Sequence, residues 1–223
     1  MNNLTLIIPA KNESECLSIV LDELRKYDYK IDIVLHPSDT KTIESIKNYD
    51  INIIYQKNKG YGDAIIEGIN NCNTEYFCIF NADGSFNPSE LKEMHHTIQL
   101  KKFDFLFASR YQANSGSEDD NLITSIGNFL FTFVGNVFFK LNITDILYTY
   151  VIGRVDSVKK LNLSQKDFSF CVELPIKAKK LNMQMMSVSS YERKRIAGLK
   201  KVNAFKDGML ILIHMVKLFF LKS

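Results

Sequence analysis

The chain has 223 residues, 46% hydrophobic and 24% charged, a composition typical of one globular α/β-sized domain with a sizeable core. Its formal net charge of +3 is too small to indicate nucleic-acid binding, so we expect no nucleic-acid partner. The four cysteines lack Cys-x-x-Cys spacing, which argues against a zinc or redox site and favours free thiols in a reducing compartment.

The first half of the chain alternates short apolar runs with segments of helical spacing. The apolar runs predict buried strands, and the capping residues and glycines between them predict helices that begin near residues 12, 60 and 88. Strands that alternate with helices indicate a mostly parallel sheet. The expected strands are 4–8, 31–35, 51–55, 76–80 and 103–108.

Polar residues follow several of these predicted strands directly. In an open parallel sheet, ligands bind beyond the carboxyl ends of the strands, so these residues are expected to share one edge and form the binding site. They are Pro9 to Glu13, His36 to Asp39, Asn81 to Asp83, and Ser109 with Arg110.

The second half of the chain has a different character. Residues 112–121 are polar and acidic, which predicts a mobile loop. Residues 122–141 are rich in phenylalanine and interrupted by Asn128 and Asn136, and residues 209–221 are apolar except for His214 and Lys217. We therefore predict a main domain over residues 1–203 and an amphipathic segment over 204–223, with no conventional transmembrane helix.

Six short motifs, in this order, resemble those of glycosyltransferase family 2, and within it the dolichyl- and polyprenyl-phosphate sugar transferases. Each motif is weak alone, but together they cover about residues 4 to 201. The motifs are the strand with Pro9 to Glu13, the Gly-rich Asn58 to Ala64 with Gly68, Asn81 to Pro88, Ala108 to Tyr111, Thr144-Asp145, and the Phe170–Glu173 helix with the closing Arg195 to Lys201.

The resemblance implies a GT-A fold, a Rossmann-like, mostly parallel sheet flanked by helices, with amphipathic helices at the C-terminus. It also implies inverting transfer from a nucleotide-diphosphate sugar, with Mg²⁺ or Mn²⁺ as cofactor and a polyprenyl phosphate as acceptor. The expected location is cytoplasmic, at the inner face of the membrane, in cell-envelope polysaccharide synthesis. Two alternatives stay open: a soluble transferase acting on a saccharide or small molecule, and a weak or inactive binding member.

The resemblance also supplies candidate donor-site residues. Asp83 is expected to bind the metal with help from Asn81, although a capping role for Asp83 is the plain alternative. Arginine and lysine side chains are expected on the diphosphate. The donor-binding candidates are Pro9, Ala10, Asn12, Glu13, Asp39, Lys59, Gly60, Asn81, Ala82, Asp83, Arg110, Arg195 and Lys201.

The chain departs from the family pattern at two places in this site. Asn81 stands where the family has the first Asp of its metal motif, and an amide oxygen brings no charge, so weaker metal binding is expected. The family's Asp-Asp-x-Ser after the second strand is replaced by residues 35–39, where Asp39 could substitute if the turn is shifted.

Asp145 is the candidate general base, because the family carries its acceptor-side aspartate at this place. A carboxylate beside an apolar segment can accept a proton usefully, whereas a phosphate acceptor would need only an orienting group. An N-cap for the stretch after Thr144 is the structural alternative.

Residues 122–141 contain five phenylalanines between 129 and 139, a high density for a core helix. By resemblance this stretch lies on a membrane surface, and 207–222 is a second interfacial candidate. Contacts between copies in a homo-oligomer are the other possibility for both segments.

Overall fold

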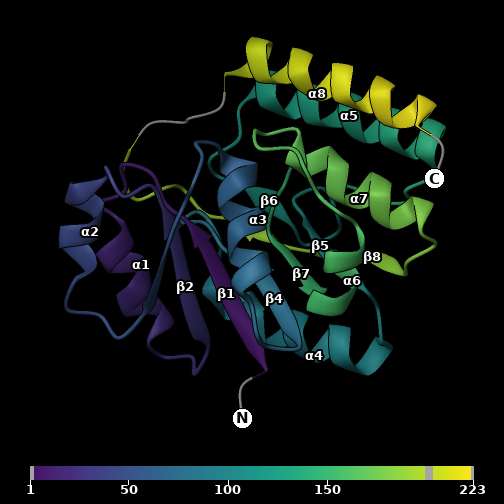
Figure 1. The fold of residues 1–223 in the computed structure, drawn as a ribbon. Coiled ribbons are helices and arrows are strands. Elements are labelled where there is room, and N and C mark those ends of the chain that lie inside the picture. The colour runs from purple at the N-terminus through teal and green to yellow at the C-terminus, as the bar shows by residue number, and fades with distance from the viewer. Residues whose placement is uncertain (1–2, 199–202, 222–223) are drawn as a thin grey trace.

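The computed structural model describes residues 3–198 and 203–221, and it contains a twisted seven-stranded sheet with helices on both faces (Figure 1). The strand order is β3-β2-β1-β4-β7-β5-β8, and every pair is parallel except that β7 runs antiparallel to β4 and β5. The strands are β1 Leu4–Pro9, β2 Lys30–Leu35, β3 Asn52–Tyr55, β4 Tyr76–Ile79, β5 Phe105–Ser109, β7 Val151–Arg154 and β8 Met185–Ser189.

The predicted mostly parallel sheet is therefore confirmed, and the five predicted strands are present. Two members of the sheet, β7 and β8, were not predicted. β7 has only four residues, and its place between β4 and β5 depends on pairing with strands about 50 to 75 residues earlier in the chain.

Helices cover both faces of the sheet, and each face has its own apolar cluster. On one face, α1 and α2 share a cluster with β1 and β2, and α4 packs on β5 and β7. On the other face, α3 packs on β1 and β2 and α6 on β7, with α7 beside α3 and with α5 and α8 beyond α7. The helices are α1 Leu17–Leu24, α2 Thr40–Ile46, α3 Tyr61–Asn71, α4 Leu91–Lys101, α5 Leu122–Phe139, α6 Val155–Lys160, α7 Phe170–Lys180 and α8 Ala204–Phe220.

The polar stretch 112–121, predicted to be a mobile loop, is paired with another part of the chain. It contains β6 (Gly116–Ser117), which pairs with β9 (Tyr191–Glu192) in a small second sheet. The Glu118 amide donates to the Glu192 carbonyl at 2.9 Å. These contacts join segments more than 70 residues apart and hold the stretch against the domain.

The helices α5 and α8 lie side by side along one end of the molecule (Figure 1). They run in the same direction, since Phe131 lies opposite Gly208 at one end and Phe219 packs edge-on against Phe138 and Phe139 at the other. α8 begins at the predicted 203/204 boundary. Its buried residues Ile211, Met215 and Leu218 nevertheless belong to the core cluster that also contains residues of α3 and α7.

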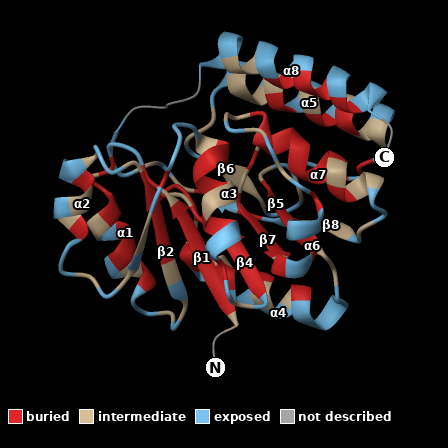
Figure 2. Ribbon diagram, in the orientation of Figure 1, coloured by how far each residue is buried: buried red, intermediate tan, exposed pale blue. Residues whose placement is uncertain are grey.

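The outer surface of this helix pair is apolar and exposed, as the pale blue outer turns in Figure 2 show. Among the described residues, α5 is the one helix long and apolar enough to cross a membrane, contrary to the expectation from the sequence. Asn128 and Asn136 do not break the helix, because both turn toward the domain and bond its backbone there.

Candidate active site

The turn after β4 carries Asp83 at the carboxyl edge of the sheet. Its Oδ1 accepts hydrogen bonds from the Ser85 amide at 3.0 Å and the Ser85 hydroxyl at 2.7 Å. Its Oδ2 faces Arg195 Nη1 at 3.6 Å. Gly84 adopts φ +80°, and a Cβ there would lie 2.4 Å from Ile196, so this turn needs glycine.

Asn81 lies in the same turn and is joined to the start of α3. The Tyr61 hydroxyl donates to Asn81 Oδ1 at 3.3 Å and lies 2.6 Å from the Thr149 hydroxyl. Asn81 and Asp83 thus offer one amide oxygen and one carboxylate oxygen at a strand end. Such a pair fits a hard cation that takes most of its ligands from phosphate and water, as Mg²⁺ does. Among the described residues, no group of three or more His, Cys, Asp or Glu side chains could hold a metal alone.

Arg195 lies over this turn and is paired with the stretch predicted to be mobile. Its guanidinium donates through Nε and Nη2 to the two oxygens of Asp119, at 3.1 and 2.9 Å. The hydrogen bonds to Asp119 raise the pKa of Arg195, with the Asp83 carboxylate adding to that shift against the effect of burial. The Ile196 amide also donates to the Asp83 carbonyl at 2.9 Å, so the 193–196 segment lies directly on the candidate metal turn.

Arg110 and Asp145 form a buried ion pair at the end of β5. Arg110 donates through Nε to Asp145 Oδ2 at 2.8 Å and through Nη2 to Oδ1 at 3.1 Å. The backbone amides of Arg110 and Tyr148 also donate to the same carboxylate, each at 3.2 Å. Both carboxylate oxygens are therefore occupied, and the Asp145 side chain has no exposed surface.

Other charged and aromatic groups surround the Arg110 guanidinium. Nη1 lies 3.1 Å from Glu192 and 3.7 Å from Asp120, and the guanidinium stacks 4.7 Å from the centre of the Tyr148 ring. Burial alone would lower the pKa of Arg110, but the Asp145 and Glu192 carboxylates outweigh it and raise that pKa further above its usual range. Burial raises the pKa of Glu192, and Arg110 offsets only part of that shift.

In this geometry Asp145 holds the Arg110 guanidinium, and both of its carboxylate oxygens already accept hydrogen bonds. An acceptor oxygen could reach it only after Arg110 had moved. Asp145 also accepts from the Tyr148 amide three residues on, as a capping residue would, but the next element is the strand β7 and not a helix. The base assignment for Asp145 stays a prediction, and the pairing with Arg110 is the fact that any mechanism must include.

The predicted residues after β1 and β2 are tied together at the same edge. Asn12 adopts φ +53°, and its amide donates to Asp39 Oδ2 at 2.6 Å. Asp39 also caps α2 through the Thr42 amide. Glu13 is buried, and its Oε2 accepts from the Cys16 thiol at 3.0 Å. Pro9 and Ala10 complete the turn, with the Ala10 amide bonded to the Val34 carbonyl.

Lys59 and Gly60 directly precede α3, and both are exposed. The backbone of the loop that contains Lys166 lies close to Gly60. Gly60 adopts φ +139°, and a Cβ there would lie 2.0 Å from the Lys166 carbonyl oxygen. That loop is fastened by the fully buried Glu173, which accepts from the amides of Ser164 and Gln165. Glu173 is thus a structural anchor of this loop.

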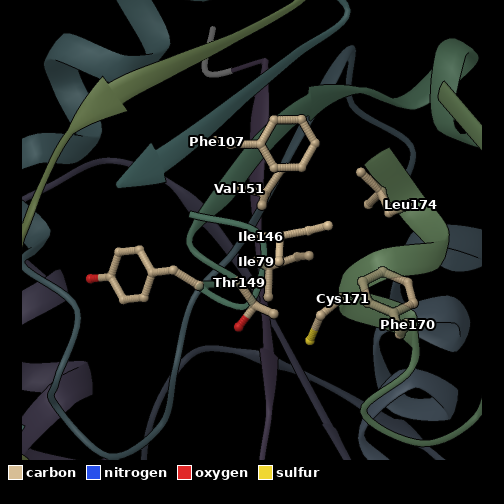
Figure 3. Close-up of a pocket in the computed structure, with 9 residues that line it drawn as sticks. Ile79, Phe107, Ile146, Thr149, Val151, Phe170, Cys171 and Leu174 are labelled. Atoms are coloured by element: carbon tan, nitrogen blue, oxygen red, sulfur yellow. The ribbon is translucent and has the colours of Figure 1, made fainter. Parts of the chain in front are cut away.

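A small apolar pocket of about 10 Å³ lies beneath this edge, between the sheet and α7 (Figure 3). Ile79, Phe107 and Val151 line one side, and Cys171 and Leu174 line the other. The pocket could hold at most one water molecule, so it is not a sugar site.

The structure brings Asn81, Asp83 and Arg195 into one cluster, and Arg110 and Asp145 into a second. Lys201 lies outside the described residues. Sequence reasoning missed Tyr61, Asp119, Tyr148 and Glu192 as parts of the site. Of these, Tyr61 has a signal in the sequence, because it lies within the Gly-rich motif from Asn58 to Ala64.

A mixed sheet of this order, with a carboxylate turn at a strand end and Arg195 beside it, is a GT-A-like fold. The chain belongs to glycosyl transferase family 2, which matches residues 5–161.

Relatives and solved structures agree with this assignment. An uncharacterised protein of Methanocaldococcus jannaschii is 26% identical over 191 residues, covering 82% of this chain and 78% of that protein. A UDP-N-acetylglucosamine–dolichyl-phosphate N-acetylglucosaminyltransferase of Methanococcus voltae is 24% identical over 207 residues, covering 82% of each chain. Glucosyl-3-phosphoglycerate synthase of Mycobacterium tuberculosis, solved with Mn²⁺, UDP and glucosyl-3-phosphoglycerate, superposes with TM-score 0.78 at 10% identity over 99% of this chain and 81% of that one.

Proposed function

We propose that this glycosyltransferase moves a sugar, with inversion, from a nucleotide-diphosphate donor to a polyprenyl-phosphate acceptor at the cytoplasmic face of a membrane. The observation that carries the proposal is the exposed apolar surface of α5 and α8 beside the site. The name of the Methanococcus voltae relative, a dolichyl-phosphate transferase, supports the same acceptor class.

The α5–α8 surface has the composition of a membrane-binding face. α5 has no charged residue in its 18 positions, and seventeen large apolar side chains of the helix pair are exposed. They are Leu122, Ile123, Ile126, Phe129, Leu130, Phe133, Val137, Phe138, Phe205, Met209, Leu210, Leu212, Ile213, Val216, Phe219, Phe220 and Leu221. An apolar surface of this size on a soluble domain marks an interaction site.

A lipid surface is the occupant that fits this face best. Both helices lie along the surface of the domain, as interfacial helices do, and the exposed lysines Lys140, Lys206 and Lys217 stand at or near its borders. The opposite, buried side of α5 bonds the segment that carries Asp145, so this helix links the exposed face to the site. In this proposal, a lipid phosphate that enters from the membrane passes α5 to reach Arg110.

The donor half of the proposal rests on the Asp83 turn and Arg195. We propose that Asp83 and Asn81 hold Mg²⁺ or Mn²⁺ against the donor diphosphate, where the ion would neutralise the leaving group. Arg195, already within 3.6 Å of Asp83, is placed to pair with the same diphosphate. Arg110 is the candidate partner for the acceptor phosphate.

The test is a transfer assay with UDP-, GDP- and CDP-sugars and Mn²⁺. Polyprenyl phosphate in anionic vesicles is compared with soluble acceptors, including 3-phosphoglycerate. We expect transfer to the lipid and loss of that transfer when the vesicles are omitted. Transfer to soluble acceptors alone would overturn the membrane proposal, and absence of any nucleotide binding would indicate a binding-incompetent member.

A further inference from the structure

The inner face of α5 carries a line of polar side chains that bond the backbone of the segment before β7. Asn128, Thr132 and Asn136 are four residues apart, which places them on one face of the helix. The Asn136 amide group bonds both the Ile143 amide, at 3.2 Å, and the Ile143 carbonyl, at 2.8 Å.

The other two residues continue this line along the segment. Thr132 Oγ1 accepts from the Ile146 amide at 3.1 Å, and Asn128 Oδ1 accepts from the Leu147 amide at 3.0 Å. Gly135 lets the helix approach closely, since a Cβ there would lie 2.9 Å from Leu141 and 3.0 Å from Ile146. These three polar residues and Gly135 fix the distance between α5 and the segment.

The opposite side of the same segment holds the charged cluster. Asp145 lies between the two residues bonded by Asn136 and Thr132, and its carboxylate takes the bidentate pair from Arg110. Thr144 is fastened as well, its hydroxyl donating to the Ser109 hydroxyl at 2.7 Å. A shift of α5 relative to the sheet would therefore move Asp145, and the Arg110 guanidinium with it.

We propose that Asn128, Thr132 and Asn136 are positioning residues that set Arg110 through Asp145, and that seating α5 on a lipid surface fixes this arrangement. The second half of the inference rests on the proposed function; the first half does not. α5 then has two roles on two faces, lipid contact outside and control of the site inside.

The composition of the line favours positioning over simple stability. Asn128 is buried, and its Nδ2 has no hydrogen-bond partner among the described residues. A buried donor without a partner costs stability, so an apolar residue would serve packing better at this position. What the asparagine supplies is the directed bond to the Leu147 amide.

The test compares Thr132→Val, which keeps the shape and removes the acceptor, with Thr132→Ser, which keeps the hydroxyl. In hydrogen exchange, the Ile146 amide should exchange about fivefold to tenfold faster in Thr132→Val than in wild type, the change expected for one lost hydrogen bond. The Thr132→Ser variant should restore slow exchange. This readout needs no substrate and stands even if the proposed function fails.

The second arm measures transfer to polyprenyl phosphate in vesicles of phosphatidylglycerol and phosphatidylcholine. We expect kcat to fall at least about tenfold in Thr132→Val, with an unchanged KM for the donor, because small misplacements of a charged group slow catalysis strongly. Thr132→Ser should keep most of the activity. Vesicles without acceptor should slow exchange at Ile146 and Leu147 in wild type and less so in Thr132→Val.

The outcomes separate the two halves of the inference. Wild-type exchange and kcat in Thr132→Val would overturn the positioning role. Equal losses in both variants would assign the effect to general packing at this position and not to the hydrogen bond, and would overturn it as well. Protection that vesicles leave unchanged in wild type would overturn the coupling to lipid. A wild-type protein that transfers no sugar would refute the proposed function while the exchange result still decides the positioning role.

Discussion

The Arg110 guanidinium lies among three carboxylates, those of Asp145, Glu192 and Asp120. Such a group is expensive to bury unless each charge has a partner, and the bidentate bond to Asp145 supplies the best geometry of the three. The three carboxylates carry more negative charge than the Arg110 guanidinium neutralises. A further cation would offset this excess, and so would protonation of Glu192, because burial raises the pKa of Glu192. The place of Arg110 after a predicted strand made it a site candidate, and the resemblance to the family added Asp145.

Their pairing could not be predicted, because the two residues are 35 positions apart and meet only through the antiparallel insertion of β7. The resemblance to the family identified both residues as candidates. Only the tertiary structure shows which oxygens of Asp145 already accept hydrogen bonds. The sequence supported a base because nothing in it shows that both oxygens are occupied.

The Asp145→Asn substitution tests this pair at the residue scale. Removing one charge of a buried pair costs about 3 to 5 kcal/mol, so we expect a lower melting temperature together with slower transfer. Thermal denaturation and rates across pH 6 to 8 are the measurements, with exposed Asp156→Asn as control. A fold of wild-type stability whose rate is about 10²- to 10⁴-fold lower would instead restore the general-base role.

The Asp83→Ala substitution tests the metal turn. We expect it to abolish the Mn²⁺-dependent part of nucleotide-diphosphate binding, since Asp83 is the only carboxylate of the Asn81–Asp83 pair. Calorimetry with UDP and GDP, with and without Mn²⁺, measures this, and Asp156→Ala is the control. Asn81→Asp should act in the opposite direction and tighten metal binding. Unchanged metal dependence in Asp83→Ala would move the ion elsewhere.

At the scale of elements, apolar runs predicted the strands that are buried on both faces, such as β1 and β4, because continuous apolar sequence has few other uses. The short strands β6 and β9 escaped prediction. Each has two residues, and their stability comes from pairing across more than 70 positions rather than from local pattern. The polarity of residues 112–121 predicted a mobile loop. In the structure, Asp119 and Asp120 of this stretch have arginine partners.

His214 gives α8 a dependence on pH. It is buried on the face of α8 that packs on the domain, and burial lowers its pKa from the ordinary value of 6.5. Glu173 and Asp167 oppose this shift, whereas Lys177 and Lys217 add to it. Because the folded pKa is depressed, the unfolded chain binds the proton more readily, so this contribution to stability is present above about pH 6.5 and is lost as the pH falls.

We therefore expect the melting temperature to fall less between about pH 7.5 and about pH 5 in His214→Leu than in wild type. The leucine keeps an apolar contact and cannot be protonated. The exposed His96→Gln in α4 is the control and should follow wild type. Equal pH dependence in wild type and His214→Leu would show that other groups govern the acid response.

At the scale of the whole molecule, the sheet places its polar strand ends and its apolar helix pair on connected surfaces. Composition predicted that 122–141 and 207–222 are interfacial, and the structure shows why neither forms a separate unit: α8 packs on α5 and α7, and α5 bonds the segment of the site. A binding experiment distinguishes a lipid surface from a second copy as the occupant of this face.

That experiment is flotation with vesicles of phosphatidylglycerol and phosphatidylcholine. Phe129 and Phe133 are 73% and 55% exposed on α5. We expect wild type to float and the double variant Phe129→Glu, Phe133→Glu to bind at least about tenfold more weakly, since burying one phenylalanine is worth about 1.5 to 3 kcal/mol. Leu100→Glu, an equally exposed apolar position on α4, is the control and should float like wild type.

A wild-type protein that stays monodisperse without detergent and never floats would refute the membrane seating. A dimer that the double variant dissociates would instead assign the face to contact between two copies.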